Sequence, residues 1–150
     1  MQPGDVIYWH DFQLQKDGEV KNRYFLYLGK SSVPETPVLV NLITTTSKLS
    51  HYASGGDREK NLVFRIDRNK YPFFTTDCLI DLNIGYQNVT QDTLNSSQVE
   101  IVGKFDLHDL STIFNRLVDA ESVPVKRLRE IRMRLEEVEC KGLKSVKSNR

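Results

Sequence analysis

The sequence predicts a mainly β domain with helices at its C-terminal end, in the α+β class. Two observations predict this class. Short stretches rich in Val, Ile, Tyr and Phe alternate with polar turns through about residue 103, which is typical of a small all-β sheet or barrel. From Asp106 onward the apolar residues instead repeat at three- and four-residue spacing, which is the period of a helix packed on a core.

Six strands are expected from the apolar stretches, at residues 4–9, 22–29, 37–43, 61–66, 78–82 and 97–103. Asp17-Gly18 lies between the first two and is typical of a hairpin turn. The third strand runs into a cluster of hydroxyl residues that begins at Thr44. Residues 44–60 contain Ser54-Gly55-Gly56-Asp57 and further charges, a composition that predicts a mobile loop without buried residues.

Two helical patterns follow the strands. The first has Asp106 in position to cap its first turn, and its apolar residues are Leu107, Leu110, Ile113, Phe114, Leu117 and Val118. Ser122 and Pro124 then indicate a new helix start. The apolar stripe beyond them consists of Val125, Leu128, Ile131, Leu135 and Val138. The second segment is therefore a second helix or a bent continuation of the first.

Basic residues flank the stripe of the second helix on both sides: Lys126, Arg127, Arg129, Arg132 and Arg134. One interpretation is a solvated face with ion pairs, such as Glu130 with Arg134 and Arg132 with Glu136. The other is a surface that meets RNA or an acidic partner. Further basic residues continue into a C-terminal tail that is expected to be disordered: Lys141, Lys144, Lys147 and Arg150.

Composition limits the possible partners. The chain has 150 residues, 39% of them apolar, which suits one domain with a modest core. With 21 basic and 20 acidic side chains, any contact with nucleic acid must come from a local patch. The absence of a long apolar run predicts a cytoplasmic protein without membrane contact. Cys78 and Cys140 have neither disulfide nor metal-ligand spacing, so no metal or cofactor is expected, and Cys78 is expected in the core.

The candidate chemistry lies at two strand ends. Arg23 is at the head of the second strand and Thr44 is at the end of the third, so a guanidinium fork and hydroxyl groups could together hold a phosphodiester. A structural interpretation of each residue is also open. Arg23 could pack its stem on a strand edge and pair with an acid. Thr44 suits a strand end, where its hydroxyl often bonds to local backbone.

The order of these pieces resembles the MazF/PemK family of toxin endoribonucleases, which share their fold with CcdB and Kid. The resemblance rests on the opening Gly4-Asp5-Val6, on Arg23, and on the apolar strand that ends at Thr44, and it covers roughly residues 3–118. It implies an SH3-like small barrel with a C-terminal helix over residues 1–118. Residues 119–140 would be a helical extension on the same domain, and residues 141–150 a flexible basic tail. It also implies a homodimer and an antitoxin protein that occupies the RNA groove.

The resemblance implies metal-independent cleavage of single-stranded RNA at short sequence motifs, which leaves a cyclic phosphate end. Arg23 and Thr44 would be catalytic. The expected RNA-binding residues are Thr45, Thr46, Ser47, Lys48, Trp9, His10 and His51, with Trp9 offering a ring for base stacking. Two alternatives remain open on the same fold. One is a non-catalytic module that binds nucleic acid or a protein, and the other is a gyrase-directed toxin.

Overall fold

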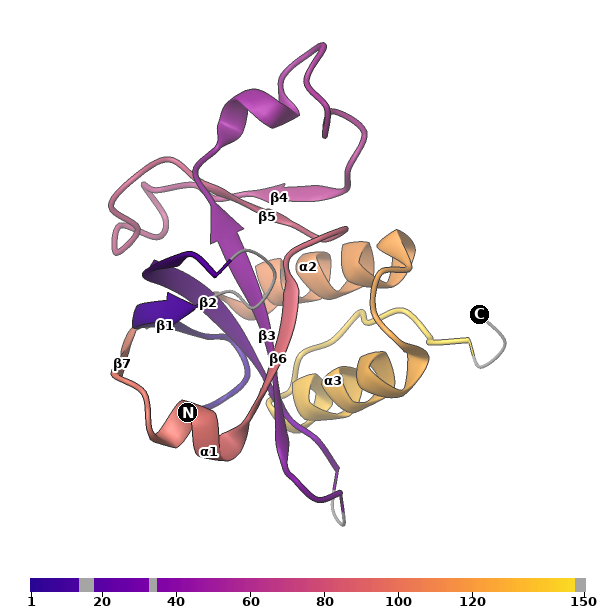
Figure 1. Cartoon of the computed structure of the whole chain (residues 1–150). Coiled ribbons are helices and arrows are strands. Elements are labelled where there is room, and N and C mark those ends of the chain that lie inside the picture. Colours follow the sequence, from indigo (N-terminus) through magenta and orange to yellow (C-terminus); the bar gives the residue numbers. More distant parts are fainter. Residues whose placement is uncertain (14–17, 33–34, 148–150) are drawn as a thin grey trace.

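The computed structural model describes residues 1–13, 18–32 and 35–147 (Figure 1). This part of the chain is mainly an antiparallel seven-stranded sheet with three α-helices, which confirms the predicted α+β class. The strands are β1 (Asp5–Gln13), β2 (Val20–Lys30), β3 (Leu39–Thr46), β4 (Val63–Arg65), β5 (Leu79–Asp81), β6 (Tyr86–Thr90) and β7 (Val99–Lys104). Asp17 of the predicted hairpin turn lies outside the described residues.

All six predicted strands are present, and β6 is additional. The sheet runs in the order β4-β5-β3-β2-β1-β7, with β6 also paired to β3. β3 pairs with β2 along one edge and with both β6 and β5 along the other. Among the described residues β4 and β7 form the two ends of this path without pairing to each other, so the sheet is open. The sequence of β6, Tyr-Gln-Asn-Val-Thr, is mostly polar and therefore does not indicate a strand. Backbone pairing with β3, rather than an alternation of apolar and polar residues, defines this strand.

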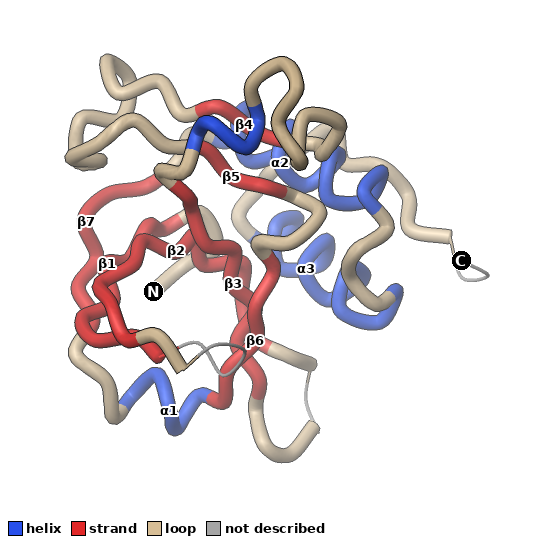
Figure 2. Tube along the Cα trace, turned by 45° about the horizontal axis from the view of Figure 1, so that its top comes forward, coloured by secondary structure: helices blue, strands red, loops and turns tan. Residues whose placement is uncertain are grey.

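Two hydrophobic clusters lie on opposite faces of the sheet. The helix-side core joins sheet residues such as Val6 and Leu26 to the apolar faces of the two long helices. The groove-side core consists of Ile7, Trp9, Phe12, Phe25, Tyr27, Val40, Leu42 and Leu94. Successive residues of a strand point to opposite faces, so Leu26 and Phe25 belong to different clusters. In Figure 2 the strands β7, β1, β2, β3 and β6 curve around the groove side.

A β-bulge in β1 shapes the groove-side core. Strict alternation would send Trp9 and Phe12 to opposite faces. The register shifts between these two residues, and Asp11 takes a positive φ of 56°. The extra residue returns Phe12 to the face of Trp9, and their rings meet edge to face at 5.0 Å.

The helices follow the sequence pattern closely. α2 (Leu107–Ala120) begins after Asp106, whose side chain accepts a hydrogen bond from the Asp109 amide at 2.7 Å. It ends at Glu121 in the left-handed conformation, so α3 (Val125–Glu137) is a separate helix and not a continuation. Both helices cover the same side of the sheet (Figure 1). Two short helical segments were not predicted, α1 (Gln91–Asn95) and the 3₁₀ helix η1 (Leu49–Tyr52).

α3 approaches β2 very closely at Gly29. A Cβ atom at this position would lie 2.6 Å from the Arg134 side chain, and the φ of Gly29 is +106°. Glycine is therefore required both by the lack of space for a side chain and by the positive φ. Arg134 then donates to the backbone carbonyls of Lys30 and Ser31. These contacts fix the helix on the strand.

Ion pairs occupy most of the basic run on α3. Arg127 pairs with both Glu35 and Glu130, and Arg132 pairs with Glu136 as predicted. The expected Glu130–Arg134 pair is not formed, because Arg134 pairs with Glu137 instead. Lys126 also pairs with Glu35. The interpretation as an ion-paired face therefore describes most of this helix, and Arg127, Arg132 and Arg134 are engaged within the chain.

The residues after α3 differ from the expected flexible tail. Arg132 donates to the carbonyls of Leu143 and Lys144. Asn115 of α2 both donates to the Gly142 carbonyl and accepts from the Lys144 amide. Leu143 packs against the helix-side core. Residues 142–144 are thus held against both helices.

Both cysteines are buried and free. Cys78 lies in the helix-side core as expected, and burial raises the pKa of its thiol to about 11. Among the described helices, none has the length and apolar content needed to span a membrane.

Deletion of residues 141–150 is expected to lower the free energy of unfolding by about 1–3 kcal/mol, because it removes partly buried apolar side chains and several hydrogen bonds. Urea unfolding of the full and shortened chains measures this. Leu143→Ser should show part of the loss, whereas Lys147→Ala, at an exposed site, should show none. Equal stability of the full and shortened chains would mean that the contacts of this segment contribute nothing.

Acid should weaken the attachment of α3. The hydrogen bond from Arg127 is the main cause that lowers the pKa of Glu35 from 4.5 to about 2. A depressed carboxyl pKa stabilises the folded chain above the unfolded pKa, and this contribution is lost as pH falls from about 4.5 to about 2. Thermal melts should therefore show Glu35→Gln below wild type at pH 7 and level with it near pH 2. Glu100→Gln, on the exposed β7 surface, is the control, and a pH-independent gap for Glu35→Gln would refute the linkage.

Candidate functional site

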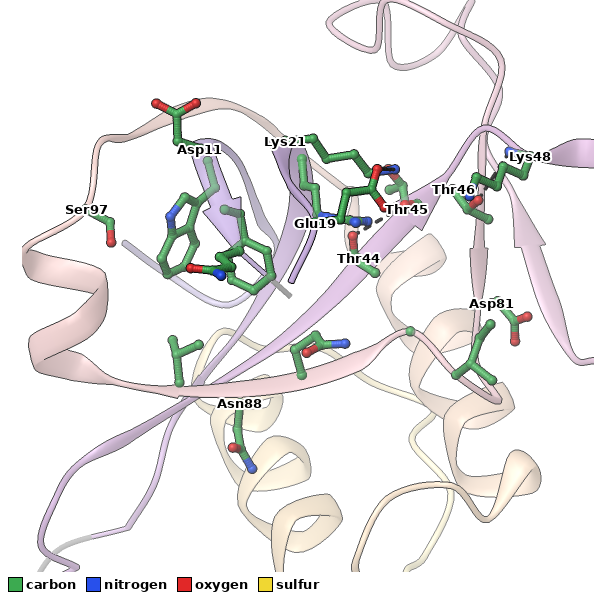
Figure 3. A pocket seen from close by; sticks show the side chains of 18 of the residues that line it. Asp11, Glu19, Lys21, Thr44, Thr45, Thr46, Lys48, Asp81, Asn88 and Ser97 are labelled. Carbon is green, nitrogen blue, oxygen red and sulfur yellow. Dashed lines mark hydrogen bonds and ion pairs between the residues drawn. The ribbon is translucent and has the colours of Figure 1, made fainter. Parts of the chain in front are cut away.

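A groove of about 890 Å³ opens on the sheet face opposite α2 and α3. Its lining comes from β1, β2, β3, β6 and the segment that follows β3 (Figure 3). Trp9 and Phe12 of the groove-side core are among its lining residues. The groove therefore has an apolar floor and a rim of polar and charged side chains.

Arg23 reaches this groove from β2, where it is paired in register with Trp9. The residue is partly buried, and its Nε atom is fully buried without a hydrogen-bond partner among the described residues. It forms no ion pair with any acid in the part of the chain that the structure describes. A buried donor without a partner costs free energy, and an acceptor that entered the groove would recover it. Arg23 is thus a preformed donor rather than a structural ion-pair partner.

Thr44 lies on the same face as Arg23. Phe25 is paired with Thr44 across β2 and β3, and Arg23 is two residues from Phe25, so alternation directs all three side chains to the groove side. The hydroxyl of Thr44 is within hydrogen-bond distance of the Tyr24 carbonyl, at 3.2 Å. Its proton is therefore directed to the backbone, as the structural interpretation of a strand-end threonine expects.

Some of the other predicted RNA-binding residues line the groove, and some do not. Thr45, Thr46, Lys48 and His51 line the groove together with Arg23 and Thr44. Ser47 is exposed next to the groove and does not line it.

Trp9 and His10 differ from their predicted roles. Trp9 lines the groove but is only 3% exposed, and its ring contacts Phe12 and Phe25. It forms the floor and offers almost no ring surface for base stacking. His10 is on the opposite face, where its ring packs edge to face against Tyr8 at 5.0 Å. His10 therefore does not join His51, and the two cannot form a paired-histidine site in this chain.

The groove also contains charged residues that sequence analysis did not select. Lys21 and Arg58 line it together with Arg23 and Lys48, and so do the acids Asp11 and Glu19. Glu19 lies beside Lys21 (Figure 3) and pairs with it at 3.8 Å. Lys21 precedes Arg23 by two residues, and this spacing was the signal that could have placed it on the same strand face. Nothing in the sequence indicated Arg58, which tertiary folding brings to the groove.

β6 forms the neutral wall of the groove. Tyr86 is paired with Ile43, so alternation sends Gln87 and Val89 to the groove side. Asn88 points away from the groove, toward the helices (Figure 3). An amide and an apolar side chain thus face the basic rim across the groove.

A buried carboxylate fixes the segment that follows β3. Asp81 is 1% exposed and accepts hydrogen bonds at 2.8 Å from Tyr52, Asn61 and the Asn83 amide. Tyr52 is itself 5% exposed. Burial is the largest cause that raises the pKa of Tyr52, and its hydrogen bond to Asp81 adds to this. The expectation that residues 44–60 bury nothing is therefore wrong, because Tyr52 anchors them to β5.

No protein-family model matches the chain, and no curated protein matches it. Within the described residues no group of three or more His, Cys, Asp or Glu side chains could hold a metal ion. The site has to be interpreted from its own geometry.

Tyr52→Phe is expected to lower the free energy of unfolding by about 1–3 kcal/mol, because it removes one of the hydrogen bonds to buried Asp81. Limited proteolysis should also show faster cleavage within residues 49–61. Tyr8→Phe is the matched control, since the Tyr8 hydroxyl has no hydrogen bond among the described residues. Unchanged stability and unchanged proteolysis of Tyr52→Phe would show that this contact does not anchor the segment.

Proposed function

We propose that the chain is a toxin-like endoribonuclease that cleaves single-stranded RNA at short sequence motifs without a metal ion. The observation that carries the proposal is Arg23, whose partly buried guanidinium has a free Nε donor beside three threonines in one groove. A guanidinium matches the geometry of a phosphodiester, and its charge offsets the negative charge on the non-bridging oxygens of the phosphorane-like transition state.

The charge distribution supports a polyanionic ligand at this groove and not at α3. Lys21, Lys48 and Arg58 line the same groove as Arg23. The arginines at 127, 132 and 134 are bound to carboxylates within the chain. In this proposal successive phosphates of the RNA follow the basic rim, and the bases face β6.

The remaining parts of the proposal follow the resemblance to the MazF/PemK family. The curved sheet would be the counterpart of the SH3-like small barrel, with the path left open between β4 and β7. Thr44 would contact the scissile phosphate once its hydroxyl turns away from the Tyr24 carbonyl. The active unit would be a homodimer, and an antitoxin protein would compete with RNA for the groove.

A second candidate is a non-catalytic module that binds nucleic acid or a protein in the same groove. One observation favours it. The Thr44 hydroxyl donates to backbone and is not directed at a ligand position. Binding through Arg23 and the basic rim requires no hydroxyl chemistry, so this candidate predicts RNA that is bound and left intact.

Arg23→Ala should abolish RNA cleavage and leave the thermal midpoint close to that of wild type, because the guanidinium makes no ion pair within the described chain. The assay incubates the purified protein with a long, weakly structured RNA in the presence of a chelator and maps the fragment ends. Arg65→Ala, at an exposed position on β4, is the matched control and should cleave normally.

Cyclic phosphate ends that disappear only in Arg23→Ala are the expected result. RNA that is retained on the protein but remains intact would replace the nuclease with the binding module. Cleavage that persists in Arg23→Ala would remove this residue from the reaction.

A further inference from the structure

His51 and Asp57 form a close pair at the edge of the groove. The Nδ1 atom of His51 lies 2.6 Å from an oxygen of Asp57, and His51 lines the groove. The other ring nitrogen, Nε2, has no hydrogen-bond partner among the described residues. A carboxylate on Nδ1 selects the tautomer that carries its proton there, which leaves the Nε2 lone pair available to a ligand.

The backbone between the two residues is built to bring them together. The Arg58 amide donates to the His51 carbonyl, and the Gly56 amide donates to the Ala53 carbonyl, each at 2.8 Å. A Cβ atom at position 56 would lie 2.4 Å from the His51 carbonyl oxygen, so only glycine permits this turn. The pair therefore depends on a closed turn and not on two independent surface side chains.

A buried residue positions the pair against the sheet. Tyr52 directly follows His51 and is held by buried Asp81. This anchor fixes the backbone of His51 in η1, which follows β3, and His51 lines the same groove as the threonines. The hydrogen bond from His51 also lowers the pKa of Asp57, which keeps the carboxylate charged at neutral pH.

We propose that His51, oriented by Asp57, is the general base of the RNA cleavage reaction; this inference rests on the proposed endoribonuclease function. Nε2 of His51 takes the proton of the ribose 2′-hydroxyl, and the 2′-oxygen forms a bond to phosphorus. The bond from phosphorus to the 5′-oxygen breaks, and that oxygen takes a proton from water. His51 then returns its proton to solvent, so the products are a cyclic phosphate and a 5′-hydroxyl.

The charges around His51 suit this role. Asp57, Arg58 and Lys48 belong to its own segment. The titratable and charged groups that share the groove from the sheet are Glu19, Lys21, Arg23, Asp11 and Asp81. Asp57 favours the protonated imidazole that forms after proton transfer, whereas the cations favour the phosphate. Asp81 is committed to Tyr52, Asn61 and the Asn83 amide.

The test compares initial rates of RNA cleavage across pH 5–9 for wild type, His51→Gln, Asp57→Asn and His108→Gln. Loss of a general base is expected to lower the rate of His51→Gln by about 10²-fold or more. Asp57→Asn should cleave more slowly, and the acid limb of its pH–rate profile should move to lower pH, because the protonated imidazole loses its carboxylate partner. His108→Gln, an exposed histidine on α2, is the matched control and should behave as wild type.

The outcomes separate the two proposals. If the wild-type protein cleaves RNA and the cleavage rate of His51→Gln is within about threefold of the wild-type rate, His51 is not the general base. The proposed endoribonuclease function would still stand. An unshifted profile for Asp57→Asn would overturn the role of Asp57 in the pair. Intact RNA with the wild-type protein would overturn the endoribonuclease and, with it, this inference. Thermal midpoints equal to wild type for both variants show that lost activity is not lost folding.

Discussion

The alternation of side chains along β2 and β3 is the constraint on which the rest of the structure depends. Leu26 and Ile43 point to the helices, whereas Phe25 and Leu42 point to the groove. Both faces of the central strands are therefore apolar, and both must be covered. The two long helices cover one face, and the curvature of the sheet with α1 covers the other. Where the apolar pattern ends, Arg23 and Thr44 emerge on the groove side.

A buried polar network then connects the fold to the site. Asp81 is surrounded by protein and is stable there because each of its oxygens accepts a hydrogen bond. Its partners, Tyr52 and Asn61, belong to the stretch after β3 that also contains the groove-lining residues Lys48, His51 and Arg58. The same contacts that satisfy one buried charge thus position several functional candidates. If this segment were mobile, each of these side chains would have to be ordered when a ligand binds, and the entropy cost would weaken binding.

The two sides of the molecule use charge differently. On α3, Arg127, Arg132 and Arg134 are paired with Glu35, Glu130, Glu136 and Glu137. The pair of Arg127 with Glu35 and the hydrogen bonds of Arg134 to the carbonyls of Lys30 and Ser31 hold the helix to the β2–β3 region. In the groove Arg23 has no such partner within the described residues. A net charge near zero is therefore compatible with a local basic site in the groove, because most of the basic side chains on α3 are already paired with carboxylates. An unpaired, partly buried guanidinium is the clearest sign of where a ligand belongs.

The sequence by itself determined the class of the fold, the positions of six strands, the cap at Asp106 and both long helices. Period and capping are local properties, so they can be recognised without tertiary contacts. It also selected Arg23, Thr44, Thr45 and Thr46, which line one groove. Only the tertiary structure placed β6, moved His10 to the other face, buried Trp9 and Tyr52, and brought Arg58 and the His51–Asp57 pair to the groove. Pairing partners, bulges and a closed turn decide these features, and they depend on contacts between residues that are distant in sequence or on a backbone conformation that composition does not specify.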